Sequence, residues 1–138
     1  MRNTRTLVIK NAMIVNENRI QTLDLLIQGK RILKIDDDIP TALADEVYDA
    51  YGKYVLPGLI DDQVHFREPG LTHKANIETE SKAALAGGIT SFIEMPNTQP
   101  QTTTRLAWEE KNQLAAATSF ANYAFMFGGT NDNLDEIL

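Results

Sequence analysis

The chain has 138 residues, of which 43% are hydrophobic, and this is enough apolar material for the core of one ordinary domain. Its formal net charge is −6, and such an acidic balance argues against nucleic acid or an anionic membrane surface as the main partner. The sequence holds no cysteine, which excludes a disulfide framework, a thiolate nucleophile and thiolate zinc ligands. Any transition metal must therefore bind to histidine, carboxylate or amide oxygen.

The first residues are basic, but the apolar run that follows them ends at Lys10. It is too short for the hydrophobic region of a signal peptide, which needs about 7–15 residues. No segment approaches the ~20 apolar residues of a membrane span. We therefore expect a soluble, cytoplasmic protein that binds neither nucleic acid nor a membrane.

Residues 1–55 have the pattern of a small antiparallel β unit. Stretches rich in Ile, Leu and Val are interrupted by turn-type clusters at residues 16–18 and 28–30, as in β-hairpins. The expected strands cover residues 7–15, 25–35 with a turn inside, 46–50 and 54–56. This unit would form the first domain of the chain.

From residue 56 onward, strands alternate with helices. Strands are predicted over 59–66, 89–95 and 120–127, helices over 77–86 and 104–117, and a further helix opens in 131–138. This order is typical of βαβ units around a parallel sheet, and therefore of an α/β fold. A closed (β/α)8 TIM barrel needs about 250 residues. We expect residues 56–138 to hold the first three βα units of such a barrel, as the front portion of a longer protein.

Polar side chains appear where the first of these strands ends. Side chains two apart on a strand share one face. The residues in that phase are Asp61, Gln63, His65 and, if the extension persists, Arg67. Active sites of parallel α/β barrels lie at the C-terminal ends of the strands, so this set is the main candidate site.

His65 and Arg67 each have a functional and a structural interpretation. At a strand end, in phase with Asp61, His65 is a candidate metal ligand through a neutral ring nitrogen, although a lone histidine is more often packed or exposed. Arg67 suits a bidentate clamp on a substrate carboxylate, and the alternative is a surface charge paired with Glu68.

The second strand adds two polar residues. Asn97 either closes the turn after Pro96 or offers an amide donor and acceptor to a cyclic amide or a carboxylate. Glu94 lies within the strand, where we expect it to face the neighbouring helices or a paired base.

Four motifs of the chain closely resemble the dihydroorotases of the amidohydrolase superfamily. They are Pro57 to Asp61, His65 to Gly70, Ala83 to Thr90 and Met95 to Thr98, and the resemblance as a whole runs through nearly all of the chain. The resemblance implies a small β-sandwich domain joined to a metal-dependent barrel. It also implies reversible cyclisation of N-carbamoyl-L-aspartate to dihydroorotate in pyrimidine biosynthesis, with zinc, as one or two ions, activating a hydroxide that attacks the ring amide. The full-length protein would then be a homo-oligomer acting on a small molecule.

Carried residue by residue, the resemblance makes His65 the second histidine of the first metal pair. Arg67 and Asn97 match contacts to the substrate carboxylate. The first metal histidine of the family falls on Gln63, whose neutral amide oxygen is a weaker zinc ligand than imidazole. Asp61 is a further, weaker metal candidate. The general acid or base of the family would lie beyond Leu138.

Two alternatives stay open at this point. Gln63 in place of a metal histidine also suits a non-catalytic dihydroorotase-like scaffold subunit. Leu71-Thr72-His73 resembles allantoinases, although these tend to differ at the Met-Pro-Asn segment, and hydantoinases usually lack an arginine at position 67. A chain of this length would be inactive by itself under any of these interpretations.

Overall fold

The computed structural model describes residues 5–138, so residues 1–4 of the predicted N-terminal unit lie outside the described part. The chain divides into two compact units, one ending at Pro57 and the other covering Gly58–Leu138. Within residues 5–138, no helix is both long and apolar enough to cross a membrane.

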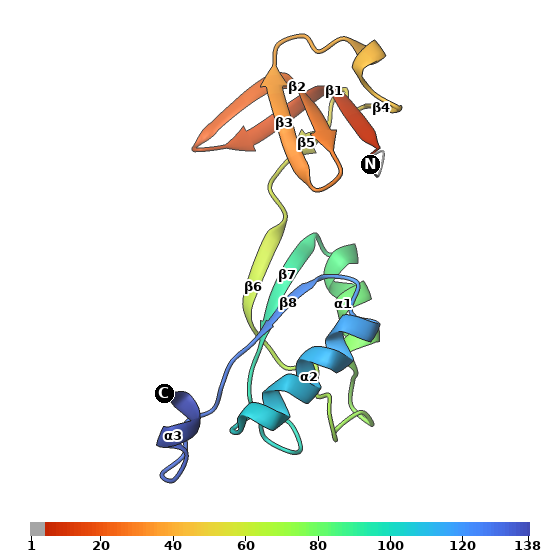
Figure 1. Ribbon diagram of the computed structural model, residues 1–138. Helices are drawn as coiled ribbons and strands as arrows, with labels where there is room; N and C mark the ends of the chain where they lie inside the picture. The colour runs from red at the N-terminus through yellow and green to blue at the C-terminus, as the bar shows by residue number, and fades with distance from the viewer. Residues whose placement is uncertain (1–4) are drawn as a thin grey trace. The chain divides into compact units, whose positions relative to one another are not determined.

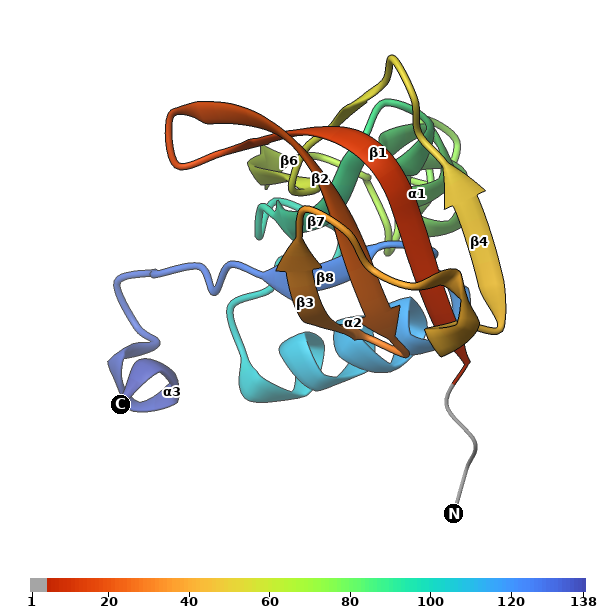
Figure 2. The ribbon, with the colours of Figure 1, turned by 90° about the horizontal axis from the view of Figure 1, so that it is seen from above.

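The N-terminal unit is one five-stranded sheet. Its strands are β1 (Thr6–Asn16), β2 (Arg19–Gln28), β3 (Arg31–Asp36), β4 (Glu46–Asp49) and β5 (Tyr54–Val55), with a short 3₁₀ turn at Thr41–Leu43. The order is β3-β2-β1-β4, and β5 also pairs with β1. In Figure 2, β4 lies beside β1 on the side away from β2.

The sheet is mixed, so the prediction of an antiparallel unit was wrong for the last two strands. The β1–β2 and β2–β3 pairs are antiparallel, whereas β4 and β5 run parallel to β1. Tight turns explain the first two pairings, because a short turn can only return the chain antiparallel to itself. The connection after β3 is longer and brings the chain back along the sheet before β4 begins. No turn motif in the sequence therefore predicts the direction in which β4 pairs with β1.

The second strand of the first hairpin, β2, also begins earlier than its apolar pattern predicts. Glu17 and Asn18 have positive φ values of 49° and 60°, which is the conformation of a tight hairpin turn. β2 therefore starts at Arg19, six residues before the predicted start at Leu25. Its first residues are polar or exposed, so their pairing with β1 leaves no apolar signal.

The C-terminal unit is an α/β layer. Parallel strands β6 (Leu59–Val64), β7 (Ile89–Glu94) and β8 (Asn122–Phe125) form a sheet in that order. The helices are α1 (Ile77–Ala86), α2 (Arg105–Thr118) and the short α3 (Leu134–Ile137). Figure 1 shows α1 and α2 on the same side of the three strands. Within the described residues this sheet is open and does not close into a barrel.

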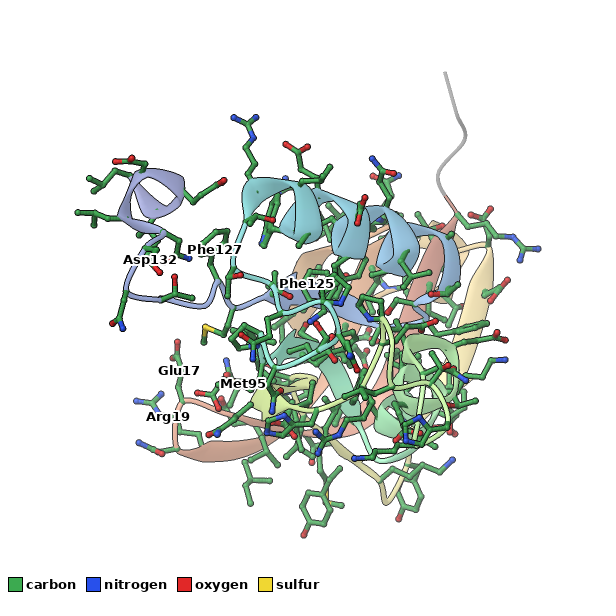
Figure 3. All side chains as sticks on the ribbon, turned by 90° about the horizontal axis from the view of Figure 1, so that it is seen from below. Glu17, Arg19, Met95, Phe125, Phe127 and Asp132 are labelled. Atoms are coloured by element: carbon green, nitrogen blue, oxygen red, sulfur yellow. The ribbon has the colours of Figure 1, made fainter. Side chains whose placement is uncertain are left out.

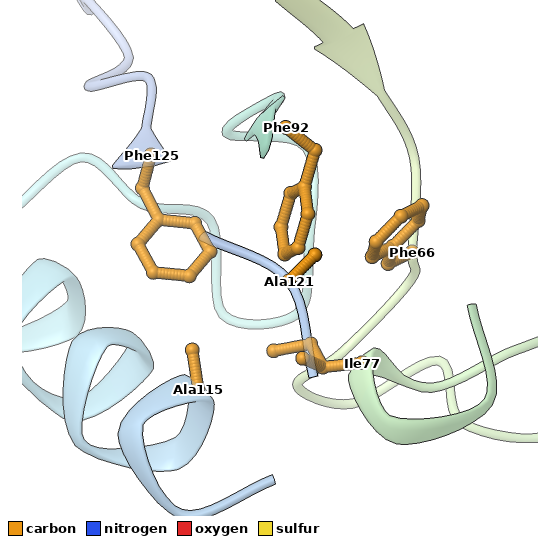
Figure 4. Close-up of a cluster of buried hydrophobic side chains, with 6 residues drawn as sticks. All are labelled: Phe66, Ile77, Phe92, Ala115, Ala121 and Phe125. Atoms are coloured by element: carbon orange, nitrogen blue, oxygen red, sulfur yellow. The ribbon is translucent and has the colours of Figure 1, made fainter. Parts of the chain in front are cut away.

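Capping residues set where the two long helices begin. The Asn76 side chain accepts a hydrogen bond from Thr79 N, and α1 starts at the predicted residue. Thr104 caps α2 in the same way through Ala107 N, so α2 begins at Arg105, one residue after its predicted start. The core between sheet and helices contains Phe66, Ile77, Phe92, Ala115, Ala121 and Phe125 (Figure 4). The rings of Phe66 and Phe92 are 4.5 Å apart, which fixes the chain just after β6 against the centre of β7.

Candidate functional site

The end of β6 presents His65 away from the helices. Val64 and Phe66 both pack in the core between sheet and helices. His65 lies between them in sequence and is exposed, so it faces the opposite side of the sheet. Gln63, on the other side of Val64, is also exposed. The strand itself stops at Val64, two residues before its predicted end.

The candidate site depends on side chains that alternate between the two faces of the strand, and this alternation is interrupted on both sides of His65. The pairing of β6 with β7 shifts register between Asp61 and Val64, which breaks the two-residue period there. The extension does not persist to Arg67, which has a left-handed φ of 69°. A common face for Asp61 and Gln63 therefore stays a prediction, and Arg67 leaves the strand instead of continuing it.

His65 and Asn97 meet across two neighbouring strand ends. His65 Nδ1 lies 2.9 Å from Asn97 Oδ1. Because an amide oxygen can only accept, Nδ1 donates in this contact, and in the neutral form of the ring the lone pair is then on Nε2. The pairing follows from the parallel ladder, which continues past β7 with a 3.0 Å bond from Met95 N to Val64 O.

Arg67 makes no ion pair within residues 5–138. Glu68, which the sequence offered as its alternative partner, binds another group. Glu68 Oε2 accepts a 2.8 Å hydrogen bond from Ile77 N, at the first turn of α1. The carbonyl of Arg67 accepts from Leu71 N at 3.0 Å and closes a turn. Arg67 is half-buried, and within residues 5–138 its guanidinium has no carboxylate partner.

A small pocket lies where the segments after β7 and β8 come together. It has a volume of about 130 Å³ and is lined by Pro96, Asn97, Gln101, Thr103, Gly128 and Gly129. Met95 and Phe127, labelled in Figure 3, immediately precede the lining residues Pro96 and Gly128. One candidate site residue, Asn97, thus belongs both to the pocket and to the contact with His65.

Asn133 links the segments that line this pocket, and the sequence analysis did not predict this role. Its side-chain amide donates 2.8 Å hydrogen bonds to the carbonyls of Thr103 and Gly128. Its Oδ1 accepts from Thr130 N at 2.7 Å. The only signal for it in the sequence is the turn-type cluster from Thr130 to Asn133, which says nothing about distant partners.

A buried ion pair lies on the helix side of β7. Glu94 faces a base from the neighbouring helix, as expected: Lys111 Nζ of α2 lies 3.1 Å from Glu94 Oε2, and both side chains are at most 1% exposed. Burial raises the pKa of Glu94, against the opposing effects of Lys111 and of the backbone N–H groups of Arg67 and Phe66. Burial lowers the pKa of Lys111, and Glu94 opposes this shift.

Lys111 was missed because a lysine in a helix is usually solvated. Its sequence signal is weak: it stands four residues before the buried Ala115, on the same helix face.

Three of the described residues carry groups that could bind a metal. His65 presents a free Nε2 and is held through Nδ1, which is the usual arrangement of a metal-binding imidazole. Gln63 and Asp61 supply oxygen donors, and the Asp61 carboxylate already accepts a hydrogen bond from Gln63 N at 3.1 Å. Residues 5–138 contain no cluster of three His, Cys, Asp or Glu side chains able to hold a metal. A catalytic zinc site with three protein ligands needs further donors.

Residues 52–127 match the family described as Dihydro-orotase-like. The chain belongs to this family. A dihydroorotase from Methanosarcina mazei is 42% identical over 129 residues, which cover 94% of this chain and 28% of that protein. An allantoinase from Deinococcus radiodurans is 38% identical, over 95% of this chain and 29% of that protein. The predicted resemblance is confirmed.

The fold of the chain is also similar to that of a solved structure. The L-hydantoinase (dihydropyrimidinase) from Arthrobacter aurescens superimposes with a TM-score of 0.92 at 35% identity, covering 96% of this chain and 30% of that chain. The chain thus spans less than a third of the length of the relatives it matches.

Proposed function

We propose that this protein is a dihydroorotase, which hydrolyses a ring amide bond of dihydroorotate to give N-carbamoyl-L-aspartate and catalyses the reverse cyclisation. The observation that carries the proposal is the contact of His65 with Asn97, at the ends of neighbouring strands, beside an arginine that makes no ion pair within residues 5–138. A candidate metal ligand and a candidate carboxylate clamp then lie at the edge of the sheet where α/β barrels hold their sites.

The proposed fold of the whole protein is a small β domain joined to a metal-dependent (β/α)8 barrel. The sheet of β1 to β5 would belong to the first, and β6, β7 and β8 with their helices would be the first three units of the second. The parallel order, with α1 and α2 on one face, supports this assignment. We place the protein in the cytoplasm and expect it to be a homo-oligomer.

His65 would hold zinc through Nε2, with Gln63 as a weaker and Asp61 as a further candidate ligand. A bound zinc ion would supply an activated water and would polarise the ring carbonyl. The hydrogen bond from His65 Nδ1 to Asn97 keeps the ring in the tautomer that this role requires. We propose that the general acid or base lies beyond Leu138.

Arg67 would bind the substrate carboxylate, because a planar guanidinium matches a carboxylate with two parallel hydrogen bonds. Asn97 can share that task. Its Oδ1 accepts from His65, and its two amide hydrogens, which have no partner among residues 5–138, can donate to a carboxylate or a ring carbonyl. Its place in the lining of the pocket supports a direct substrate contact.

Two alternative functions are each favoured by a particular observation. Gln63, at the position of a metal histidine of the family, favours a dihydroorotase-like scaffold subunit without catalysis. The allantoinase and hydantoinase relatives favour a different cyclic amide as substrate. Neither the scaffold nor the enzyme for another cyclic amide provides a substrate carboxylate for Arg67. We therefore rank both below the dihydroorotase.

The test is a substrate panel on the full-length protein loaded with zinc, cobalt or manganese. We expect turnover of dihydroorotate, and weaker or no turnover of hydantoin and allantoin. Arg67→Ala should raise KM for dihydroorotate about 100-fold, since the lost charge-assisted pair contributes roughly 3 kcal/mol. The exposed Arg19→Ala is the matched control. No turnover of dihydroorotate with any of the three metals would defeat the proposal in favour of the scaffold.

A further inference from the structure

We propose that Asn133 is a positioning residue that sets the width of the pocket beside Asn97, and thereby the place from which Asn97 meets the substrate. Asn133 is not among the residues that line this pocket. In this proposal its single carboxamide ties the two walls of the pocket together. The inference rests on the proposed function for its kinetic readout, but the placement of the walls can be tested without any activity.

The two walls of the pocket belong to chain segments that have left the regular sheet. The parallel ladder continues one bond past β7 and β8, from Met126 N to Glu94 O at 2.9 Å. After this bond, the lining residues within 96–103 form the first wall, and Gly128 with Gly129 forms the second wall. Bonds other than the strand ladder therefore set the distance between the walls.

Asn133 makes a hydrogen bond to one residue of each wall. Its Nδ2 donates to the carbonyl of Thr103 and to the carbonyl of Gly128, both at 2.8 Å. Each of the two hydrogens on this nitrogen serves one carbonyl, so the walls can lie no further apart at this point than one amide group spans. The Oδ1 accepts from Thr130 N at 2.7 Å, which fixes the carboxamide itself.

Gly128 shows how closely the walls approach. Its N–H donates to the carbonyl of Thr102 at 2.8 Å. A Cβ at Gly128 would lie 3.0 Å from Thr103 Cγ2 and 3.3 Å from Pro96 Cβ, closer than carbon atoms normally pack. Thr102 N in turn donates to the carbonyl of Pro96 at 2.9 Å and closes the first wall into a loop. Asn97 follows Pro96 directly, so its position depends on this arrangement.

The short helix α3 does not explain the side chain of Asn133. The residue stands at the N-cap of α3, where an asparagine normally accepts a hydrogen bond from an N–H group of the first turn. Asn133 makes no such bond to α3. It is buried instead, and its amide bonds to residues 103, 128 and 130. Holding the two walls accounts for this amide better than starting a helix does.

The proposed function gives this link a kinetic consequence. Asn97 bonds to His65 through Oδ1, at 2.9 Å, and we propose that its amide hydrogens donate to the substrate. If the walls separate, Asn97 keeps its chemistry but changes its position. The substrate then loses a contact that ground state and transition state share, which raises KM more than it lowers kcat.

The experiment uses three variants of the full-length protein. Asn133→Asp keeps the size of the side chain but places an oxygen, in place of the two N–H donors, against two carbonyls. Gly128→Ala adds a methyl group between the walls and leaves Asn133 unchanged. The matched control is Asn122→Asp, the same substitution at the start of β8, where Asn122 Nδ2 donates to the carbonyl of Thr90 at 3.2 Å. This contact lies at the opposite end of the strand from the pocket.

Two measurements are made on each variant. The first is amide hydrogen exchange at Gly128 and Thr102, with Phe92 of β7 as internal reference. The second is KM and kcat for dihydroorotate. In Asn133→Asp we expect the Gly128 and Thr102 amides to exchange about tenfold faster, with exchange at Phe92 unchanged. KM should rise about tenfold while kcat changes less than about threefold.

Gly128→Ala should speed exchange at Thr102 and raise KM in the same direction, and the control should match the wild type in both measurements. Wild-type exchange in Asn133→Asp would overturn the proposal. Faster exchange with a wild-type KM would also overturn it, because Asn133 would then be structural only. If Asn133→Asp does not fold, Gly128→Ala decides by the same two criteria.

The two proposals can fail separately. A wild-type protein without dihydroorotate turnover would refute the proposed function, and the exchange measurement would then decide whether Asn133 holds the walls of the pocket.

Discussion

Nδ1 of His65 and Oδ1 of Asn97 are 2.9 Å apart, although 32 residues separate them in the sequence. One residue follows β6 and the other follows β7, and the parallel pairing of these strands brings their ends to the same edge of the sheet. The hydrogen bond fixes the imidazole tautomer and leaves Nε2 free. A histidine that was only a candidate from its place in the sequence thereby becomes an oriented one.

This contact predicts the effect of removing Asn97. Asn97→Ala should weaken zinc binding at the His65 site by about 10- to 100-fold, the usual result of losing the partner that orients a metal-binding imidazole. Titration calorimetry with zinc on the full-length protein measures the change. Asn131→Ala, an exposed asparagine after β8, is the control and should bind zinc like the wild type. Equal affinities for the two variants would mean that Asn97 does not orient the ring.

Glu68 and Arg67 are neighbours with separate tasks, and their variants should differ. Glu68→Ala removes the acceptor of Ile77 N and should lower the free energy of unfolding by about 1 kcal/mol, like the loss of a helix cap. Its KM for dihydroorotate should change far less than that of Arg67→Ala. Urea denaturation and steady-state kinetics on both variants check this. A similar rise in KM for both would show that the two side chains act as a pair after all.

Gly70 should be much less tolerant of a side chain than Gly88. Both have positive φ values, 83° and 88°, so an alanine costs each of them about 1 kcal/mol in conformational strain. A Cβ at Gly70 would also lie 1.9 Å from the carbonyl oxygen of Gln99, whereas no atom of the described residues outside its chain neighbours lies within 4 Å of one at Gly88.

We therefore expect Gly70→Ala to lower the free energy of unfolding by roughly 3 kcal/mol or more, and Gly88→Ala by about 1 kcal/mol. Urea denaturation of the two variants side by side makes the comparison. Equal losses would show that the turn at Gly70 is free to move away from Gln99.

Asp24 should make the N-terminal sheet sensitive to acid. Burial by itself would raise the pKa of this carboxyl, but Lys10 and the backbone N–H groups of Ile39 and Asn11 outweigh it and lower the pKa below its ordinary 3.8. A carboxylate with a lowered pKa contributes stability that is complete above the unfolded pKa and is lost as the pH falls through the folded pKa.

Asp24→Asn should therefore lower the free energy of unfolding by roughly 2–3 kcal/mol at neutral pH, because it leaves Lys10 and the N–H groups of Asn11 and Ile39 with a weaker acceptor. The difference from wild type should shrink as the pH falls below 3.8, the ordinary pKa of the carboxyl, and through the lowered pKa at which the wild-type Asp24 takes up a proton. Denaturation at several pH values measures this, with the exposed Asp37→Asn as control. A difference that stays constant over this range would exclude Asp24 as the source.

Much of the fold follows from local signals in the sequence. Asn76 and the glycines after Ala86 give α1 its correct bounds, and the alternation of strands and helices after Pro57 gives the parallel sheet. These features depend on neighbours within a few residues, such as a side-chain cap or a turn, and the sequence records such neighbours directly. The early start of β2 and the parallel partners of β1 depend on pairing with distant strands, which leaves no local pattern.

The candidate site divides in the same way. The amino-acid sequence determined which side chains are available at the strand ends, His65, Arg67 and Asn97, because a break in an apolar run shows where a strand stops. Only the tertiary structure decided that His65 is bonded to Asn97, that Glu68 serves α1 instead of Arg67, and that Lys111 lies against Glu94. The physical reason is that a hydrogen bond or a buried ion pair requires two groups within about 3 Å. For residues 9 to 32 positions apart, that distance is set by how strands and helices pack.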